Sequence, residues 1–318
     1  MSVKALERYP RRTVSRIQRA LRRPTVREAI EGYICILPWI IGFLTFVAGP
    51  IIASLVISFL KWDIVSPARW VGLNNYVAIF TDDADFLQAL KVTVIYATFT
   101  LLLNLVLGLG ISLLLNMKLP GIGSYRTLFY LPSVMSGVAV TLLWIWIFNP
   151  EFGVINYLLS FVGIQGPRWL YSSRWALPAM IIMSLWGVGG TSVIYLAGLQ
   201  NIPRHLYETA QVDGANGWHR LWRITIPLLT PTIFFQLVLG LIGAFQVFTQ
   251  SYVATGGGPR KSTLFYMLYL YIKAFRSLRM GYASALAWIL AFIVLIITVL
   301  IFKSSPMWVY YEAEVRQR

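Results

Sequence analysis

The chain has 318 residues, of which 58% are hydrophobic and 12% charged, and its formal net charge is +15. A soluble domain carries roughly twice this share of charged residues, so the composition excludes one large soluble core. Nine of the 27 basic residues fall within the first 27 positions, and most of the others flank apolar runs. This placement is typical of membrane-topology signals and not of a nucleic-acid-binding groove.

Six long apolar runs predict six membrane-spanning helices. Each run is long enough to cross a hydrocarbon core of about 30 Å, and none alternates as the strands of a membrane barrel would. Because backbone groups in lipid must pair within their own segment, the runs are expected to be helical. The predicted fold is an all-α membrane protein with spans at about 34–60, 90–116, 125–148, 176–199, 226–250 and 283–303.

These spans are expected to form one transmembrane domain, residues 33–303, between a basic N-terminal tail (1–32) and a C-terminal tail (304–318). Lysine and arginine are concentrated in the N-terminal tail and in the segments that alternate with it across the membrane. The bias predicts that both termini and the segment 200–226 lie in the cytoplasm. Two apolar pieces too short to span, 155–163 and 263–275, are predicted to be interfacial or re-entrant helices on the outer side.

The centres of the six spans contain no Asp, Glu, Lys, Arg or His. Proton- and ion-coupled carriers usually need ionisable groups at that depth. Neutral polar side chains do occur there, and several lie beside aromatic rings, which suits a neutral polyhydroxylated solute. The same residue types also join helices to one another, and both interpretations stay open. These residues are Asn104, Ser184, Thr191, Ser192, Gln236, Gln246, Thr249 and Gln250.

Motifs for catalysis, metal binding and nucleotide binding are missing from the sequence. Cys35 is the one cysteine and the chain has two histidines, which together do not predict a metal site. The stretch TGGGPRKS (255–262) fails the phosphate-loop spacing because Arg260, not glycine, precedes Lys261. No nucleophile is paired with a base at membrane depth. If ATP drives this protein, another chain must bind it.

Between the fourth and fifth spans lies a polar segment with its own helix signals. Pro203 suits the first turn of a helix, and residues 204–213 read as that helix. Gly214 is free to adopt the left-handed conformation that ends it, and Asn216 can cap a second short helix. Pro227 marks re-entry into the membrane. The sequence therefore predicts a compact helix–glycine–helix unit held between two spans.

This segment resembles the cytoplasmic signature of binding-protein-dependent ABC importers: E-A-A, three residues, a glycine, nine residues and I-x-L-P. The spacing is kept, although Thr209 replaces alanine and Ile226 replaces leucine. The resemblance implies that the segment is the coupling helix, which contacts a separate ATPase. The residues it assigns to this role are Glu208, Thr209, Ala210, Asp213, Gly214, Ala215, Ile224 and Pro227.

Further stretches resemble the carbohydrate branch of that family, of the maltose and glycerol-3-phosphate permease type. They are VGLNNYVAIF (71–80), TGGGP (255–259) followed by Tyr269 and Tyr271, KAF (273–275) and GYASA (281–285). The similarity covers roughly residues 33–303.

The resemblance implies a type I ABC importer permease fold in the cytoplasmic, or inner, membrane of a bacterium or archaeon. It implies a second, homologous permease chain, two ATPase subunits that hold ATP and magnesium, and an extracytoplasmic binding protein that delivers a sugar or oligosaccharide. The chain itself is expected to bind no cofactor and no nucleic acid and to catalyse no reaction. The family's solute pocket implies a pathway through Ser184, Trp186, Gly187, Thr191, Phe245, Gln246 and Gln250, where Gly187, Gly189 and Gly190 are expected to leave an open surface.

Two other classes of function stay open from the residues alone. A self-sufficient secondary carrier of a neutral solute would transport without ATP or partners, and the uncharged spans argue against it. A membrane enzyme or scaffold would act as the purified chain, and the missing nucleophile–base pair argues against the enzyme.

Overall fold

The computed structural model describes residues 24–310, so the N-terminal residues 1–23, most of the predicted basic tail, lie outside the described part. The chain divides into two compact units, Met1–Val56 and Ile57–Arg318. In the first unit, α2 (Pro24–Phe43) continues through a π-type turn, Leu44–Ala48, into α3 (Gly49–Ser58). None of the described side chains before Ser54 is buried. A helix that is apolar on all sides and exposed is typical of a membrane span.

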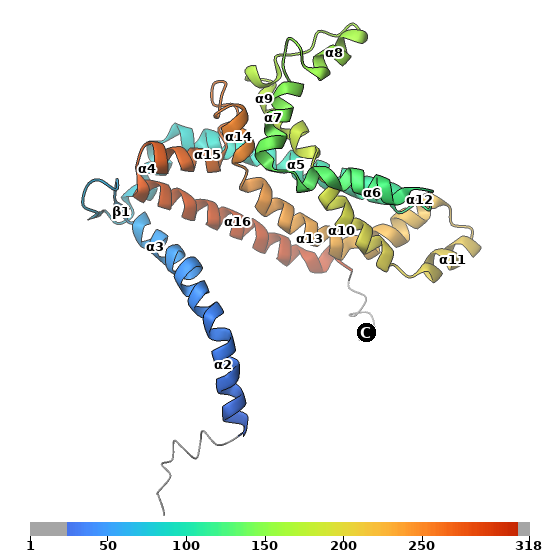
Figure 1. Ribbon diagram of the computed structural model, residues 1–318, viewed down its shortest axis with the longest axis horizontal. Coiled ribbons are helices and arrows are strands. Elements are labelled where there is room, and N and C mark those ends of the chain that lie inside the picture. The colour runs from blue at the N-terminus through green and yellow to red at the C-terminus, as the bar shows by residue number, and fades with distance from the viewer. Residues whose placement is uncertain (1–23, 311–318) are drawn as a thin grey trace, which may run out of the picture. The chain divides into compact units, whose positions relative to one another are not determined.

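The second unit is almost entirely helical (Figure 1). Within residues 57–310, the one sheet is a two-stranded antiparallel hairpin in which β1 (Leu60–Lys61) pairs with β2 (Arg69–Trp70). Its helices are α4 (Asn74–Thr81), α5 (Ala84–Leu115), α6 (Ile122–Tyr130), α7 (Gly137–Ile147), α8 (Val154–Phe161), α9 (Ala176–Leu185), α10 (Val188–Asn201), α11 (Arg204–Val212), α12 (Gly217–Arg220), α13 (Ile226–Phe245), α14 (Thr249–Ala254), α15 (Tyr266–Tyr271) and α16 (Met280–Trp308).

Within residues 24–310, four helical stretches are long and apolar enough to cross a membrane, and two bent helix pairs bring the number to six if each pair is one span. The four stretches are Glu31–Ser58, Ala84–Leu115, Gly217–Ala254 and Met280–Trp308, each close to a predicted span. Predicted boundaries differ most where polar residues extend a helix. α5 begins at Ala84, six residues before the apolar run, because Asp83 caps its N-terminus.

The third and fourth predicted spans are not single straight helices. In the third, α6 and α7 meet at 99°, and in the fourth, α9 and α10 meet at 42°. The first break follows Pro132 and lies at Met135–Ser136, where the backbone becomes extended. Proline, glycine and serine are the residues at which helices usually kink, and Gly187 lies at the second break. A third interruption, Gln246–Phe248, separates α13 from α14 inside the predicted fifth span.

The two short apolar pieces are helical, as expected. Residues 154–161 form α8, and the second piece contains α15 followed by a π-type turn, Ile272–Arg276. α8 buries Ile155 and Leu159 against the α7–α9 region, whereas Tyr157 and Phe161 are exposed.

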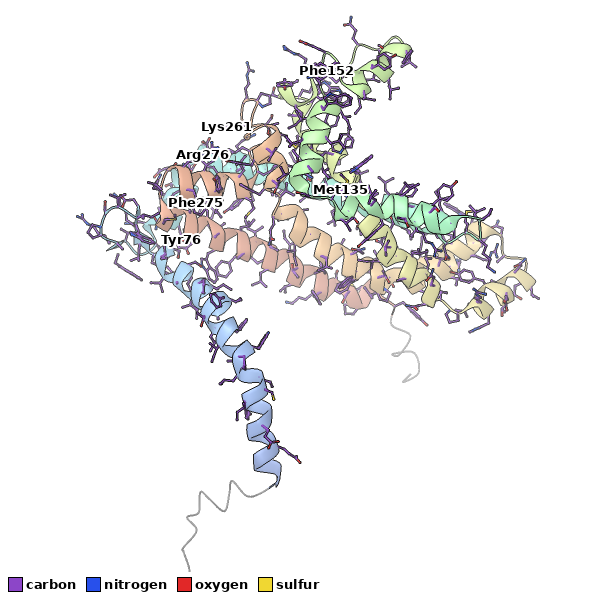
Figure 2. The ribbon with its side chains drawn as sticks, in the orientation of Figure 1. Tyr76, Met135, Phe152, Lys261, Phe275 and Arg276 are labelled. Carbon is purple, nitrogen blue, oxygen red and sulfur yellow. The ribbon has the colours of Figure 1, made fainter. Side chains whose placement is uncertain are left out.

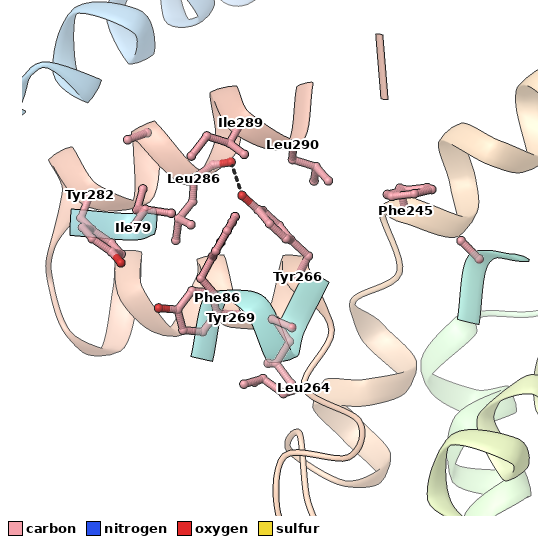
Figure 3. Close-up of a cluster of buried hydrophobic side chains, with 14 of the residues drawn as sticks. Ile79, Phe86, Phe245, Leu264, Tyr266, Tyr269, Tyr282, Leu286, Ile289 and Leu290 are labelled. Atoms are coloured by element: carbon pink, nitrogen blue, oxygen red, sulfur yellow. Dashed lines mark hydrogen bonds between the residues drawn. The ribbon is translucent and has the colours of Figure 1, made fainter. Parts of the chain in front are cut away.

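The main core of this unit joins the start of α5 to α15 and α16. Phe86, Tyr266 and Leu286 are each at most 1% exposed there. Figure 3 shows the Tyr266 hydroxyl donating a hydrogen bond of 2.8 Å to the backbone oxygen of Leu286. This core fixes one end of the unit, at the start of α16, far from α11 and α12 (Figure 1).

Candidate functional site

The predicted helix–glycine–helix unit is present between α10 and α13, and we call residues 203–227 the coupling segment. α11 follows Pro203, and Gly214 ends it with φ of +78°, in the left-handed region that favours glycine. The Ala215 N–H donates to the oxygen of Ala210 at 2.8 Å and closes the turn. The Asn216 side chain then accepts from the His219 N–H at 2.8 Å and caps α12.

The coupling segment is tied to the spans on one side. The hydroxyl oxygens of Tyr207 and Thr225 lie 2.9 Å apart, which joins α11 to the turn that leads into α13. Leu206 and Ile224 pack against a small core that contains Leu199 and Leu229, from α10 and α13. Because both neighbouring spans contribute to this core, a force on α11 is transmitted to both.

The eight predicted coupling residues divide by position. Glu208, Thr209, Asp213 and Gly214 are exposed on the free side of the segment. Neither carboxylate makes an ion pair within the described residues. The other four residues are half-buried and support this surface; they are Ala210, Ala215, Ile224 and Pro227.

The sequence reasoning missed three apolar side chains on the same segment. Val212 is 88% exposed beside Gly214, and Trp218 is 66% exposed. The rings of Trp218 and Trp222 meet edge to face with centroids 5.6 Å apart. A valine and two tryptophans within a polar loop were the available signal, because exposed large apolar side chains mark interaction surfaces.

A cavity of about 210 Å³ lies between α5, α9, α10 and α13. Its lining includes Ser184 and Thr191 from the predicted pathway, together with two amides, Asn104 and Gln236. Gln236 is 7% exposed, and its side chain donates to the backbone oxygen of Thr191 at 3.1 Å. Gln236 therefore joins α13 to α10, whereas the one hydrogen bond described for the Asn104 side chain stays within α5, to the oxygen of Thr100 at 2.9 Å.

The other predicted pathway residues lie around this cavity and not in its lining. Phe245 is 3% exposed in the main core, while Gln246 is exposed at the break after α13. Gln250 accepts a hydrogen bond of 3.1 Å from the hydroxyl of Tyr96, which lines the cavity. Trp186 packs edge to face on Trp144, with centroids 5.8 Å apart, and Gly187 is exposed next to it.

A comparison with protein families decides the class of the chain. Residues 107–304, more than half of the sequence, match the family described as binding-protein-dependent transport system inner membrane component. The chain belongs to this permease family. It is an inner-membrane component of an ABC transporter, a transport subunit and not an enzyme.

The permease is similar to named relatives over almost its whole length. It is 46% identical over 292 residues to YesP of Bacillus subtilis, a probable ABC transporter permease protein, with 91% of this chain and 94% of the relative covered. It also matches a permease chain in the crystal structure of a bacterial ABC transporter that imports the acidic polysaccharide alginate. There the TM-score is 0.79 and the identity 28%, with 89% of this chain and 97% of the other covered.

A second structure of such an alginate transporter was solved in complex with its periplasmic protein bound to an alginate pentasaccharide. The permease matches it with the same TM-score, 0.79, and 28% identity, over 88% of this chain and 96% of the other. These matches confirm the helical ABC permease fold expected from the sequence.

In the permease, the stretches that resemble the carbohydrate branch meet around one carboxylate. Asp83 accepts hydrogen bonds from the hydroxyls of Tyr269 and Tyr282, and Lys273 Nζ lies 3.8 Å from its Oδ2. The other oxygen accepts from the backbone at the start of α5, including Phe86 N at 3.3 Å. These contacts hold α5, α15 and α16 together at the end away from the coupling segment.

The permease's glycine-rich loop is also held by its own contacts. Lys261 Nζ lies 2.5 Å from the carboxylate of Asp85, and the Gln88 amide donates to the Lys261 oxygen at 3.3 Å. The lysine therefore pairs with a carboxylate at the start of α5. Among the described residues, no group of three or more His, Cys, Asp or Glu is placed to hold a metal ion.

Proposed function

We propose that this permease forms half of the translocation pathway of an ATP-driven sugar importer. A second, homologous permease chain supplies the other half. Two ATPase subunits, which hold ATP and magnesium, dock on the coupling segments, and an extracytoplasmic binding protein delivers the sugar. Both termini and the coupling segment face the cytoplasm in this arrangement, in agreement with the charge bias of the sequence.

The observation that carries the proposal is the construction of the coupling segment. One side of α11 is fixed to α10 and α13 through Leu206 and the Tyr207–Thr225 contact. The other side presents Glu208, Val212 and Asp213 without partners among the described residues. A short helix fixed on one side and free on the other is suited to receive motion from a bound subunit and pass it to two spans.

The cavity between α5, α9, α10 and α13 is the proposed part of the sugar path in this chain. Its neutral hydroxyl and amide groups, from Asn104, Ser184 and Thr191, can bond sugar hydroxyls. Gln246 lies at the break after α13, and Gln250 lies in the first turn of α14, bonded to Tyr96 of the cavity lining; both belong to the proposed path. Trp186 and Gly187, which are exposed, and Phe245, which is buried in the main core, remain on the proposed path.

Changing Gly214 to Asp tests the docking of the ATPase. The φ of +78° strains any residue with a side chain, and open space around the glycine means that the new carboxylate projects from the surface without a clash. We expect at least a tenfold loss of ATPase subunits that co-purify with the permease, equivalent to about 1.4 kcal/mol. Sugar uptake into ATP-loaded vesicles should fall with it.

Gly163→Asp is the matched control. Gly163 has φ of +74° and equally open surroundings, and it lies in the loop after α8. The two variants introduce the same charge and the same backbone strain, at opposite predicted sides of the membrane. If Gly214→Asp inserts, retains its ATPase and transports like Gly163→Asp, the coupling role is wrong.

A further inference from the structure

A polar cavity of the second unit lies at the end opposite the coupling segment. Its volume is about 770 Å³, and it opens between the β1–β2 hairpin, the start of α4 and the start of α16. Its lining includes Lys61, Arg69 and Arg279, together with Trp62 and Asn74. We call it the hairpin cavity.

Hydrogen bonds fix the walls of the hairpin cavity. The Asn75 side chain donates to the backbone oxygens of Ser58 and Leu60, at 2.8 and 2.9 Å. Gly281 N donates to the Trp62 oxygen at 3.3 Å, and a Cβ at Gly281 would lie 1.8 Å from the Leu60 oxygen. The hairpin is thus held to α4 by the Asn75 side chain and to α16 by a backbone hydrogen bond, which together fix the walls of the cavity.

The cavity has an excess of positive charge. Lys61 and Arg69 are exposed, and neither makes an ion pair within residues 24–310. The guanidinium carbon of Arg279 lies 4.4 Å from the centre of the Tyr282 ring. Asp63 is the one carboxylate in the lining, and its oxygens accept from Ser66 N at 2.7 Å and Ser66 Oγ at 3.0 Å.

The nearby carboxylate of Asp83 does not neutralise these cations. It is bound by two tyrosine hydroxyls and lies 3.8 Å from Lys273. Figure 2 shows further basic side chains, Lys261 and Arg276, at the same end of the unit. Of these two, Lys261 is paired with Asp85. The unpaired cations of the hairpin cavity therefore favour an anionic partner.

The position of the cavity indicates which partner this is. α16 has 29 residues and extends over about 43 Å. Its first turn borders the cavity, and just after its end Tyr310 N donates to Thr230 Oγ1 at 2.8 Å, on the helix that follows the coupling segment. The cavity and the coupling segment thus lie at opposite ends of α16. If the coupling segment faces the ATPase, the cavity faces the side from which sugar arrives.

We infer that the hairpin cavity is the seat for an acidic loop of the extracytoplasmic binding protein, with Lys61, Arg69 and Arg279 facing its carboxylates. This inference rests on the proposed function, and it adds the surface and the chemistry of the contact. The volume accommodates several side chains, and Trp62 with the two arginines supplies the residue types that dominate protein interfaces. A matching transporter structure contains a bound periplasmic protein.

The test uses the complete transporter in liposomes and the solute-binding protein that stimulates its ATP hydrolysis. The double variant K61E/R69E reverses two charges in the cavity. Stimulation is measured relative to ATP hydrolysis without binding protein. The concentration of binding protein that gives half of the maximal stimulation should be at least tenfold higher for the variant than for the wild type. Added salt should raise this concentration for the wild type and much less for the variant, because salt screens only attractions that are present.

R168E/R174E is the matched control, since both arginines are exposed and neither lines the hairpin cavity. It makes the same total change of charge in the segment between α8 and α9. The half-stimulating concentration of this variant should stay within about twofold of the wild type, the range expected for exposed charges outside the contact. An equal shift in both double variants would overturn the inference and leave the proposed function intact.

Two other outcomes would distinguish failure of the proposed function from failure of the docking role. If no binding protein stimulates the wild-type transporter, the proposed function itself fails, and the inference with it. If an alginate oligosaccharide binds the transporter without binding protein, and K61E/R69E abolishes that binding while stimulation stays normal, the cavity holds an acidic sugar and the docking role is wrong.

Discussion

At the scale of single residues, Asp83 has the largest number of contacts among the acidic side chains described. Burial alone would raise its pKa, but hydrogen bonds from Tyr269 and Tyr282 and the charge of Lys273 outweigh burial and hold the pKa below its usual value. The carboxylate therefore stabilises the packed arrangement of α5, α15 and α16. This stabilisation is complete above the unfolded pKa, about 4, and is lost as pH falls through the folded pKa.

Asp83→Asn should lower the stability of the transporter by about 2 kcal/mol, because asparagine keeps the cap of α5 but loses charge-assisted hydrogen bonds. The measurement is the temperature at which half of the detergent-solubilised complex aggregates. The difference from wild type should be constant between pH 8 and 5 and should shrink below about pH 4. Asp82→Asn, at an exposed neighbour, is the control. A pH-independent difference would show that the charge of Asp83 does not contribute.

The sequence did not predict the contacts of Asp83. Its tyrosine partners are 186 and 199 residues away, and nothing local in the sequence links these positions. The resemblance to the carbohydrate branch marked Tyr269, Lys273 and Tyr282 without giving a reason for them. The structure supplies one, since all three surround a single carboxylate. By contrast, Gly214 and Asn216 were predictable, because turn and cap conformations depend on adjacent residues.

At the scale of helices, hydropathy predicted where apolar segments lie but not their direction. A window average over residues 125–148 is high whether the helix is straight or bent, so the 99° break between α6 and α7 was missed. Pro132 followed by Ser136 and Gly137 was the signal available.

The expectation of an open surface at three glycines of the fourth span was wrong for Gly189. That glycine is buried, and a Cβ there would lie 1.7 Å from the backbone oxygen of Phe129 and 2.6 Å from its carbonyl carbon. At the neighbouring Gly190, a Cβ would make an ordinary contact of 3.4 Å with Ser133 Cβ. Gly189 is thus the point at which α10 passes closest to α6.

Gly189→Ala should separate α10 from α6, since backbone atoms cannot move aside as a side chain would. We expect the free energy of unfolding to fall by about 1–3 kcal/mol, the cost typical of an overpacked core. The yield of folded transporter should fall as well. Gly190→Ala should behave like the wild type. The measurement is the monodisperse fraction in size-exclusion chromatography after heating. Equal behaviour of the two variants would mean that this close approach is absent in the assembled transporter.

At the scale of the whole molecule, the cavity proposed as the sugar path lies between the coupling segment and the hairpin cavity. The coupling segment is connected to the spans that carry Thr191 and Gln236, and the hairpin cavity borders the start of α16. One signature and a few stretches of the sequence resembled an ABC importer permease, and the family match confirms that resemblance. The amides that line the cavity could not be separated from those that join helices until their hydrogen-bond partners were known.

Because Gln236 joins two helices and Asn104 does not, replacing each of them by leucine should have a different effect. Asn104→Leu removes an amide that lines the cavity and breaks no described hydrogen bond between helices, because the one hydrogen bond of Asn104 stays within α5. Sugar uptake should fall about fivefold, the effect of losing one hydrogen bond of roughly 1 kcal/mol. Stimulation of ATP hydrolysis by the binding protein should persist, so that more ATP is used for each sugar.

Gln236→Leu instead removes the hydrogen bond from α13 to the Thr191 oxygen of α10. It should lower the free energy of unfolding of the transporter by about 1 kcal/mol. This is somewhat more than the average measured for hydrogen bonds between helices in membranes. The preference between two sugars should stay unchanged. Uptake of two labelled sugars in competition, with ATP hydrolysis measured in the same vesicles, separates the two variants. If Asn104→Leu transports with wild-type rate and preference while Gln236→Leu changes the preference, the pathway runs along α13, and Asn104 only fills space.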